Sequence, residues 1–152
     1  MDRQQILTTN EGNIAEFRAS GGRLAAFGDQ PVLLLTTTGA KSGERRTSPM
    51  MYLPDAEDSN IVYVFASFAG ADINPAWFHN VVAHPTELAV EIGNESLTAS
   101  ATILPEQRRA EVYAEQAGRH ESFAQYQTKT SRAIPVVALT LCRGQRSHPV
   151  GR

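Results

Sequence analysis

The sequence predicts a mostly β fold, either an antiparallel barrel or an α+β sheet, with about six short strands and flanking helices. Three runs rich in branched and aromatic residues precede the second helical segment. Two later runs of the same kind are joined only by Gly93-Asn94, a two-residue signal for an antiparallel hairpin. Helical periodicity is too scarce to supply the crossover helices that a parallel Rossmann sheet requires.

The N-terminal half is expected to hold one short helix and then three strands. A helix over residues 9–18 is indicated because Ile14 and Phe17 lie three apart among polar residues, and Gly21-Gly22 would end it. The first strand, residues 31–38, is apolar and then β-branched, which suits a strand buried on both faces at its start. The other two strands are predicted over residues 46–53 and 61–67.

The C-terminal half is expected to contain two helices and three further strands. Pro75 suits the first turn of a short helix over residues 76–83, because a residue there does not need its N–H. Pro105 likewise opens a helix that Gly118 ends. Strands are predicted over residues 87–92, 95–104 and 134–141, with a polar stretch at 122–132 before the last of them.

Length and composition limit the possible functions. The 152 residues, 41% of them hydrophobic, suffice for one core, so we expect a single domain over residues 1–152 with loose ends at 1–14 and 143–152. A balance of 14 basic and 16 acidic residues argues against DNA or any other nucleic acid as a partner. Cys142 alone cannot form an intrachain disulfide, and neither a signal peptide nor an apolar run of about 18 residues is visible. We therefore expect a cytoplasmic protein.

The first segment that indicates chemistry is the turn within residues 36–49. It combines glycines with the cations Lys41 and Arg46. Backbone N–H groups exposed in such a turn, flanked by cations, can hold a phosphate or a carboxylate. An ordinary basic hairpin loop is the alternative. A Walker A loop is excluded, because that motif requires glycine where Leu35 and Ala40 stand.

Two more segments offer candidate ligand contacts. Within residues 66–80, a strand that ends in small residues lets a flat ligand approach the backbone, and Trp77 and Asn80 offer a wall and an amide. The alternative is that Trp77 packs in the core. Tyr126 lies three residues after Phe123 and, in a helix, would supply a phenol that donates a proton or a hydrogen bond. A surface tyrosine without such a role is the alternative.

No metal centre is indicated by the sequence. Among the histidines only His79 and His84 are close, and their spacing of five residues misses the i, i+4 face that chelation uses. A Gly-x-Ser-x-Gly nucleophile elbow is also absent from the sequence. The expected chemistry therefore needs neither a metal ion nor a covalent nucleophile.

Four segments between about residues 15 and 141 indicate a family. Their occurrence together and in order is more specific for a family than any one of them alone. They are Phe17–Arg23, Leu33–Gly43 with Arg46 and Pro49, Asn74–Trp77 with Asn80, and Ser131–Val137. Together they resemble the deazaflavin-dependent nitroreductase family, whose members are also described as F420H2-dependent quinone reductases. The resemblance implies an actinobacterial split β-barrel, similar to the FMN-binding flavin reductases. It also implies reduced coenzyme F420, an 8-hydroxy-5-deazaflavin, as the cofactor.

The resemblance further implies an oxidoreductase that transfers a hydride from F420H2 to a small electrophile such as a quinone, an enone or a nitro compound. Lys41 and Arg46 would hold the phosphate and the polyglutamate tail of the cofactor. Tyr126 and Ser67 are the expected catalytic residues, which would orient or protonate the substrate. The cofactor-binding residues implied are Lys41, Ser42, Gly43, Arg46, Ser48, Pro49, Ala66, Ser67, Phe68, Ala69, Gly70, Asn74, Pro75, Ala76, Trp77 and Asn80.

Two departures from the family pattern leave alternatives open. Phe68-Ala69-Gly70 stands where the family often has a Lys-Gly-Gly or a similar polar turn, so one phosphate contact is missing. Family members that reduce nitroimidazoles carry several tyrosines at places that look like His120, Phe123 and Tyr126 here, and a phenylalanine donates no proton. A non-catalytic deazaflavin carrier or sequestering protein is thus one alternative, and an FMN- or haem-binding split barrel is another.

The expected partner is a small-molecule substrate, and the protein is expected to be a monomer or a homodimer. A peripheral membrane contact through the N-terminal helix also stays open, because Ile14 and Phe17 share one face of that short helix.

Overall fold

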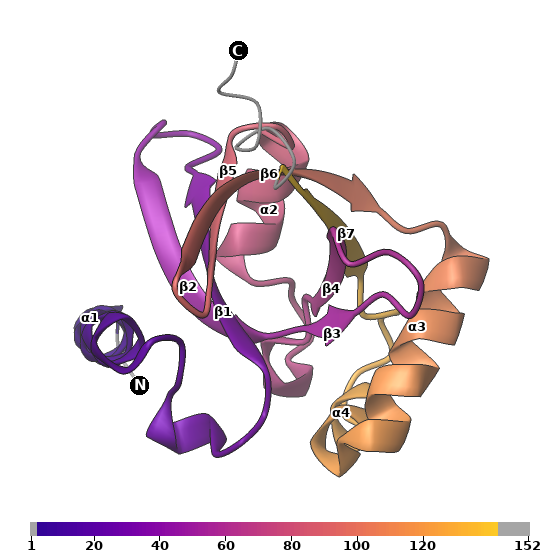
Figure 1. Ribbon diagram of the computed structural model, residues 1–152. Helices are drawn as coiled ribbons and strands as arrows, with labels where there is room; N and C mark the ends of the chain where they lie inside the picture. Colours follow the sequence, from indigo (N-terminus) through magenta and orange to yellow (C-terminus); the bar gives the residue numbers. More distant parts are fainter. Residues whose placement is uncertain (1–2, 143–152) are drawn as a thin grey trace.

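Seven strands form one curled sheet in the computed structural model, which describes residues 3–142 (Figure 1). Every pair of neighbouring strands is antiparallel, in the order β2-β1-β5-β6-β7-β4-β3. The predicted mostly β class with flanking helices is confirmed. The strands are β1 (Val32–Thr38), β2 (Arg45–Met51), β3 (Leu53–Pro54), β4 (Ile61–Phe65), β5 (Leu88–Ile92), β6 (Glu95–Ile103) and β7 (Val136–Leu141).

The curl of the sheet is imposed at Tyr52, where the chain leaves one edge strand and enters the other. β2 pairs with β1, whereas β3, which follows Tyr52 directly, pairs with β4 at the far edge of the sheet. The Tyr52 N–H donates to the carbonyl of Pro31 at 3.2 Å, which continues the β1–β2 register by one residue before the chain passes to the other edge. The single strand predicted over residues 46–53 is therefore two strands, which brings the two edges of the sheet toward each other.

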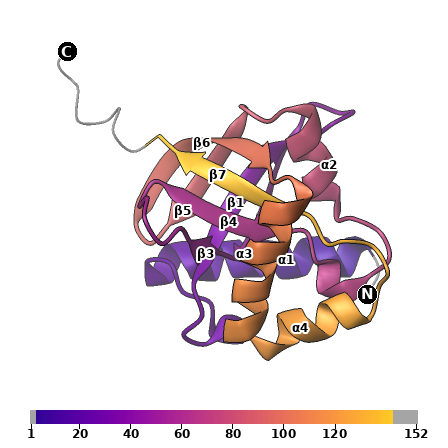
Figure 2. The same ribbon diagram turned by 90° about the vertical axis from the view of Figure 1, so that its right-hand side faces the viewer.

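Four α-helices and two short 3-10 helices accompany the sheet: α1 (Arg3–Ser20), η1 (Ala25–Phe27), η2 (Phe68–Gly70), α2 (Ala76–Ala83), α3 (Glu106–Arg119) and α4 (Glu121–Thr128). Figures 1 and 2 show α1 on the side of β1 and β2, and α3 and α4 on the side of β4 and β7. The first helix begins at Arg3 instead of residue 9, so residues 3–14 are helical. The tail predicted at 143–152 lies outside the described residues.

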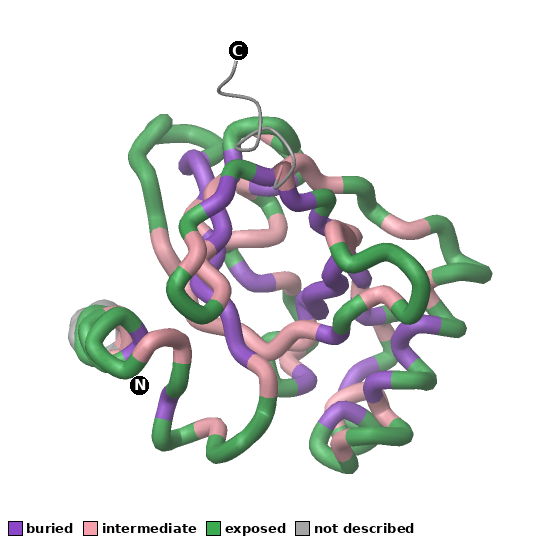
Figure 3. The backbone as a smooth tube through the Cα atoms, in the orientation of Figure 1, coloured by how far each residue is buried: buried purple, intermediate pink, exposed green. Residues whose placement is uncertain are grey.

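Side chains point alternately to the two faces of each strand, and the buried ones form three clusters, an inner core and two outer cores. Along β1, Leu33 and Leu35 face the inner core, while Val32 and Leu34 face α1. Because successive side chains point to opposite faces, a strand covered on both sides must be apolar at every position. This is the pattern that the sequence shows at residues 31–38, and Figure 3 follows the buried residues along the strands.

The outer cores fix the helices against the sheet. Phe17 of α1 is buried beside Leu34, and Arg18 reaches Glu91 of β5 with two hydrogen bonds of 2.9 and 2.8 Å. The residue that suggested a membrane contact, Phe17, thus faces the sheet. No helix among residues 3–142 has the length and apolar character needed to cross a membrane.

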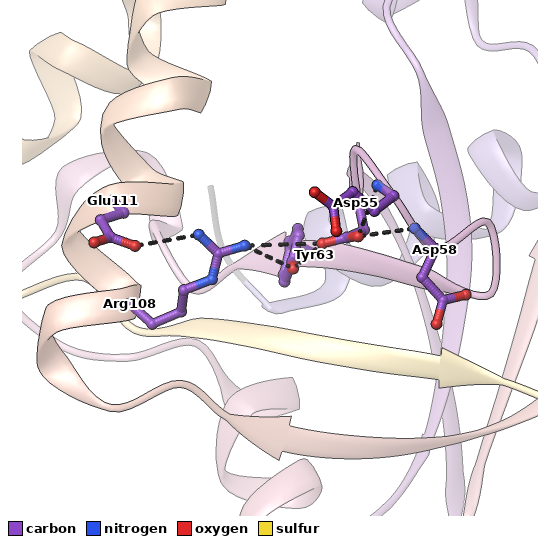
Figure 4. Close-up of polar contacts among 6 residues, drawn as sticks. Asp55, Asp58, Tyr63, Arg108 and Glu111 are labelled. Atoms are coloured by element: carbon purple, nitrogen blue, oxygen red, sulfur yellow. Dashed lines mark hydrogen bonds and ion pairs between the residues drawn. The ribbon is translucent and has the colours of Figure 1, made fainter.

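A polar network ties α3 to the turn between β3 and β4, as Figure 4 shows. The Tyr63 hydroxyl donates to the carboxylate of Asp55, and Arg108 of α3 donates to the same hydroxyl at 3.2 Å. Arg108 also lies 3.3 Å from a carboxylate oxygen of Glu111. The hydrogen bond from Tyr63, followed by those from the N–H groups of Glu57 and Asp58, lowers the pKa of Asp55.

Tyr113 joins α3 to α4 within the second outer core. Its ring packs edge-on against Phe65 and Phe123, with centroids 5.9 and 6.2 Å away. Its hydroxyl donates to the carbonyl of Phe123 at 2.6 Å. Burial of the phenol, with a smaller contribution from nearby Tyr126, raises the pKa of Tyr113 to about 12.

The free energy of unfolding should therefore fall with rising pH in the alkaline range. The pKa of Tyr113 is raised above its ordinary value of 10.0, so its contribution is intact below pH 10.0 and is lost as the pH rises to about 12. Tyr113→Phe should flatten this dependence and cost about 1–3 kcal/mol at neutral pH, because the buried Phe123 carbonyl loses its donor. Urea denaturation at several pH values measures both effects.

Tyr126→Phe is the matched control, because the Tyr126 hydroxyl makes no hydrogen bond with any residue between 3 and 142. An equal loss of stability in that variant would contradict the assignment of the effect to the Tyr113 hydrogen bond.

Candidate active site

The turn between β1 and β2 presents two cations to solvent. Its backbone is closed by hydrogen bonds from Gly39 N–H to the Glu44 carbonyl (2.7 Å) and from Gly43 N–H to the Gly39 carbonyl (3.0 Å). The Gly43 N–H is thus used within the turn and not offered to a ligand in this conformation. Residues 40–46 are all exposed, as Figure 3 shows. The Lys41 ammonium makes no hydrogen bond or ion pair with the described part of the chain.

The two arginines of this turn have different roles. Arg45 donates to Thr38 Oγ1 at 2.8 Å and to the Glu87 carbonyl at 2.9 Å, so it joins β2 to the start of β5. Arg46 pairs with Glu44 at 2.9 Å, and both side chains are at least half exposed. An exposed ion pair of this kind contributes only about 0–1 kcal/mol, so an anionic ligand can replace Glu44. Lys41 and Arg46 are therefore the available cations.

Asn80 connects the same turn to α2. Its side-chain oxygen accepts a hydrogen bond from the Ala40 N–H at 2.9 Å, and its nitrogen donates to Thr37 Oγ1 at 3.1 Å. The amide that the sequence offered as a ligand contact is thus engaged at both ends. Its position makes Asn80 a bridge between α2 and the turn between β1 and β2.

At the other end of α2, residues 66–74 form a tight loop with an unusual backbone. Phe68 and Ala69 have positive φ angles of 45° and 54°, and Gly70 has one of 83°. Gly70 packs so closely on α4 that a Cβ atom there would lie 2.9 Å from the Tyr126 carbonyl oxygen. The structure therefore brings the loop that contains Ser67 next to the helix that contains Tyr126.

The residues predicted for catalysis lie on these two packed elements. Tyr126 is half-buried, with its ring centroid 5.2 Å from that of Phe123. It lies in the helix α4, and a helical segment was the condition under which its phenol was predicted to act. Phe123 itself is buried among Phe65 and Tyr113, so this side chain belongs to the core. Ser67 is half-buried, and its hydroxyl makes no hydrogen bond within residues 3–142.

Trp77, at the start of α2, is consistent with both predicted alternatives, a wall beside a ligand and a residue that packs in the core. Trp77 is half-buried, packs against the inner core, and lies edge-on to Phe78 with centroids 6.4 Å apart. Pro75 is buried and Ala76 is exposed. Ser48 and Pro49 lie in β2 opposite Leu35 and Leu34, and both are half-buried.

Arg132 is a residue of this region that the sequence did not assign. Its guanidinium donates to the carbonyls of Ala66, Ser67 and Ala71 and to the side-chain oxygen of Asn74. The sequence marked Ser131–Val137 only as a segment of the resemblance. The position of an arginine just before the last strand was the only sequence signal for this role. The acceptors are mainly backbone carbonyls, which every residue has, so the sequence does not show which of them the arginine contacts.

A cavity of about 330 Å³ lies at the other end of the strands. Ile92 and Leu141, which end β5 and β7, line it together with Asp55 and Glu57. None of the predicted cofactor-binding residues lines this cavity. Its carboxylates make it unsuitable for a polyanionic ligand. Among residues 3–142, no three His, Cys, Asp or Glu side chains lie close enough to hold a metal ion.

Comparison with known proteins identifies relatives over most of the chain. Residues 11–141 match the family model described as F420H(2)-dependent quinone reductase. A protein of Mycobacterium tuberculosis named F420H(2)-dependent quinone reductase is 34% identical over 133 residues, which are 83% of this chain and 85% of that protein.

Two solved structures show the same relationship in three dimensions. A structure described as an F420-H2 dependent reductase is 36% identical, with a TM-score of 0.62 over 72% of this chain and 93% of that one. Another, described as a domain-swapped dimer, is 37% identical, with a TM-score of 0.63 over 73% of this chain and 81% of that one. The predicted resemblance and the split-barrel fold are confirmed.

The family model covers nearly all of the described residues, and it includes both the cationic turn and the loop at Ser67. The chain belongs to the F420H2-dependent quinone reductase family and is an oxidoreductase that depends on reduced coenzyme F420.

Proposed function

We propose that this protein transfers a hydride from F420H2 to a small electrophilic acceptor, with a quinone favoured over other conjugated carbonyls and nitro compounds. The observation that supports the site is the arrangement around α2. The cationic turn is hydrogen-bonded to Asn80 of α2, and the loop at residues 66–74 leads into the start of the same helix. Asn80 lies four residues after Ala76, which is a rise of about 6 Å along the helix, so α2 connects the two segments over a short distance.

The residues of the turn fit the charged part of the cofactor. Lys41 and Arg46 are exposed cations on a protein whose net charge is -2. They would hold the phosphate and the carboxylates of the cofactor tail, because charge-assisted hydrogen bonds from lysine and arginine are the strong contacts for such groups. Glu44, which now pairs with Arg46, would be displaced. The predicted contribution of Gly43 would require a change of the turn, since its N–H is already bonded.

The loop and the start of α2 fit the flat, largely apolar part of the cofactor. Ala66, Ser67, Ala69 and Gly70 are small, and Trp77 offers one half-buried aromatic face. Arg132 donates to the side-chain oxygen of Asn74. The side-chain nitrogen of Asn74 makes no hydrogen bond within residues 3–142, so it is left to donate. When bound, F420H2 supplies the hydride. The protein supplies orientation and exclusion of water.

Reduction of a quinone carbonyl adds a hydride to the acceptor and requires a proton at its oxygen. Tyr126 and Ser67 are the residues proposed to hold that oxygen and to deliver the proton. Their hydroxyls make no hydrogen bond within the described part of the chain, and α4 packs directly on η2. Phe123 does not compete for this role, since it is buried in the core.

We also infer a homodimer, since one similar solved structure is described as a domain-swapped dimer. Light scattering on the purified protein tests this assembly.

Fluorescence titration with F420, followed by single-turnover oxidation of F420H2, tests the proposed function. We expect micromolar binding, equivalent to about 8 kcal/mol, and oxidation by at least one quinone. No binding at tens of micromolar cofactor would contradict the proposal. Tight binding without oxidation by quinones, enones or nitro compounds would favour the carrier, and a yellow or red protein as purified would favour an FMN- or haem-binding barrel.

Combined removal of Lys41 and Arg46 by substitution with alanine should raise the dissociation constant for F420 about tenfold or more, which is about 1.4 kcal/mol. The loss should shrink at high salt, because exposed charges are screened. A variant that removes Arg23 and Arg119 in the same way is a matched control, since both are exposed and lie outside the turn. Equal effects of the two double variants on binding would remove the assignment of the turn.

Tyr126→Phe should lower turnover more than it weakens cofactor binding, because the phenol is proposed to act on the acceptor. Steady-state kinetics with a quinone, beside the F420 dissociation constant, separate the two effects. The same assays on Ser67→Ala measure how much the second hydroxyl contributes to turnover and to cofactor binding. A proton-donor role for Tyr126 is excluded if turnover and binding fall together.

A further inference from the structure

The loop at Ser67 has a backbone that its sequence does not favour. Phe68, Ala69 and Gly70 are three consecutive residues with positive φ angles of 45°, 54° and 83°. Residues with a Cβ atom rarely adopt this region, because the Cβ approaches the following carbonyl oxygen. A strained conformation of this kind persists only where the surrounding structure enforces it.

The guanidinium of Arg132 holds the loop on both sides of the strained residues. It donates to the carbonyls of Ala66 (3.2 Å) and Ser67 (3.0 Å), which precede them, and to the carbonyl of Ala71 (2.8 Å), which follows them. A fourth bond of 2.8 Å goes to the side-chain oxygen of Asn74. Every hydrogen bond that this guanidinium makes within residues 3–142 is directed to the loop.

The support behind Arg132 is rigid. The segment that follows it enters β7, whose Val136 pairs with Phe65 of β4, and the Ala66 N–H donates to the Pro135 carbonyl at 3.0 Å. Burial lowers the pKa of Arg132, while the nearby Asp72 acts in the opposite direction. An arginine side chain keeps its charge under such a perturbation. The loop is thus clamped by a fixed cation.

One consequence of the clamp is the exposure of Phe68. Its side chain is 49% exposed although it is large and apolar. Within the turn, the Gly70 N–H donates to the Ser67 carbonyl at 2.8 Å and the Ala71 N–H to the Phe68 carbonyl at 3.0 Å. The backbone is therefore turned so that the side chain of Phe68 stands at the surface.

We propose that Arg132 is a positioning residue that keeps Phe68, Ala69 and Gly70 in their left-handed conformation and thereby sets the F420 ring site, with Phe68 presented to the bound ligand. This inference rests on the proposed function. Lysine cannot replace the arginine, because a single ammonium point charge does not reach carbonyls on both sides of a turn in the fixed fork geometry of a guanidinium.

The test compares Arg132→Lys with Arg109→Lys. Arg109 is similarly enclosed, with 14% of its side chain exposed, and donates to the Ile134 carbonyl at 3.1 Å, but it makes no bond to residues 66–74. Arg132→Lys should raise the F420 dissociation constant about tenfold or more and speed hydrogen exchange of the amides at 67–71. Arg109→Lys should leave the dissociation constant within about twofold of the wild-type value, whatever its effect on the melting temperature.

A rescue variant separates positioning from general stability. Ala69→Gly placed in the Arg132→Lys background should recover part of the lost affinity, because glycine adopts positive φ without strain. A purely structural role of Arg132 predicts no such recovery. If Arg132→Lys does not fold, Arg132→Gln and the double variant with Ala69→Gly provide the same comparison.

The outcomes are distinguishable from failure of the proposed function. Wild-type protein that does not bind F420 would overturn the proposed function and this inference with it. Wild-type binding together with unchanged binding and exchange in Arg132→Lys would overturn the inference alone, as would equal losses of affinity in the Arg132 and Arg109 variants.

Discussion

The packing of α2 against the inner core of the curled sheet positions two elements of the candidate site, the cationic turn and the loop at Ser67. Val81 is fully buried there, and Trp77 and Phe78 pack against the same core. Since α2 cannot shift without opening this core, its two ends are rigid attachment points. Asn80 holds the cationic turn at one end, and the loop at Ser67 enters the other.

Charge is distributed so that the two ends of the strands offer different environments. The end next to α2 carries the exposed cations of the turn, with Glu44 as a weakly held counter-ion. The opposite end carries Asp55 and Glu57 around the cavity, and Arg108 there already serves Tyr63 and Glu111. In the proposed binding mode, a polyanionic cofactor would therefore be attracted to the first end of the sheet and repelled from the second, although the net charge is only -2.

Local patterns predicted most of the strands and helices, because burial on one or both faces leaves a period of two or an apolar run in the sequence. β1 and α2 were predictable in this way, and the family resemblance gave the split barrel. The change of pairing partner at Tyr52 was not predictable from the sequence, because no local pattern distinguishes a strand that changes its neighbour from one that continues. The hydrogen bonds of Asn80 and Arg132 were likewise not predictable, because their partners lie far along the chain and are largely backbone atoms.

The two halves of the site also differ in how firmly they are held, and the difference matches what each must do. Binding a flexible, highly charged tail requires charge more than geometry, and long exposed side chains such as Lys41 and Arg46 supply it. Transfer of a hydride requires the reacting atoms to be held near contact distance and in line. In the proposed site, the loop beside Tyr126 would meet that requirement through a strained backbone that Arg132 clamps on both sides. The rigid part of the site is thus the part where small displacements would cost the most in rate.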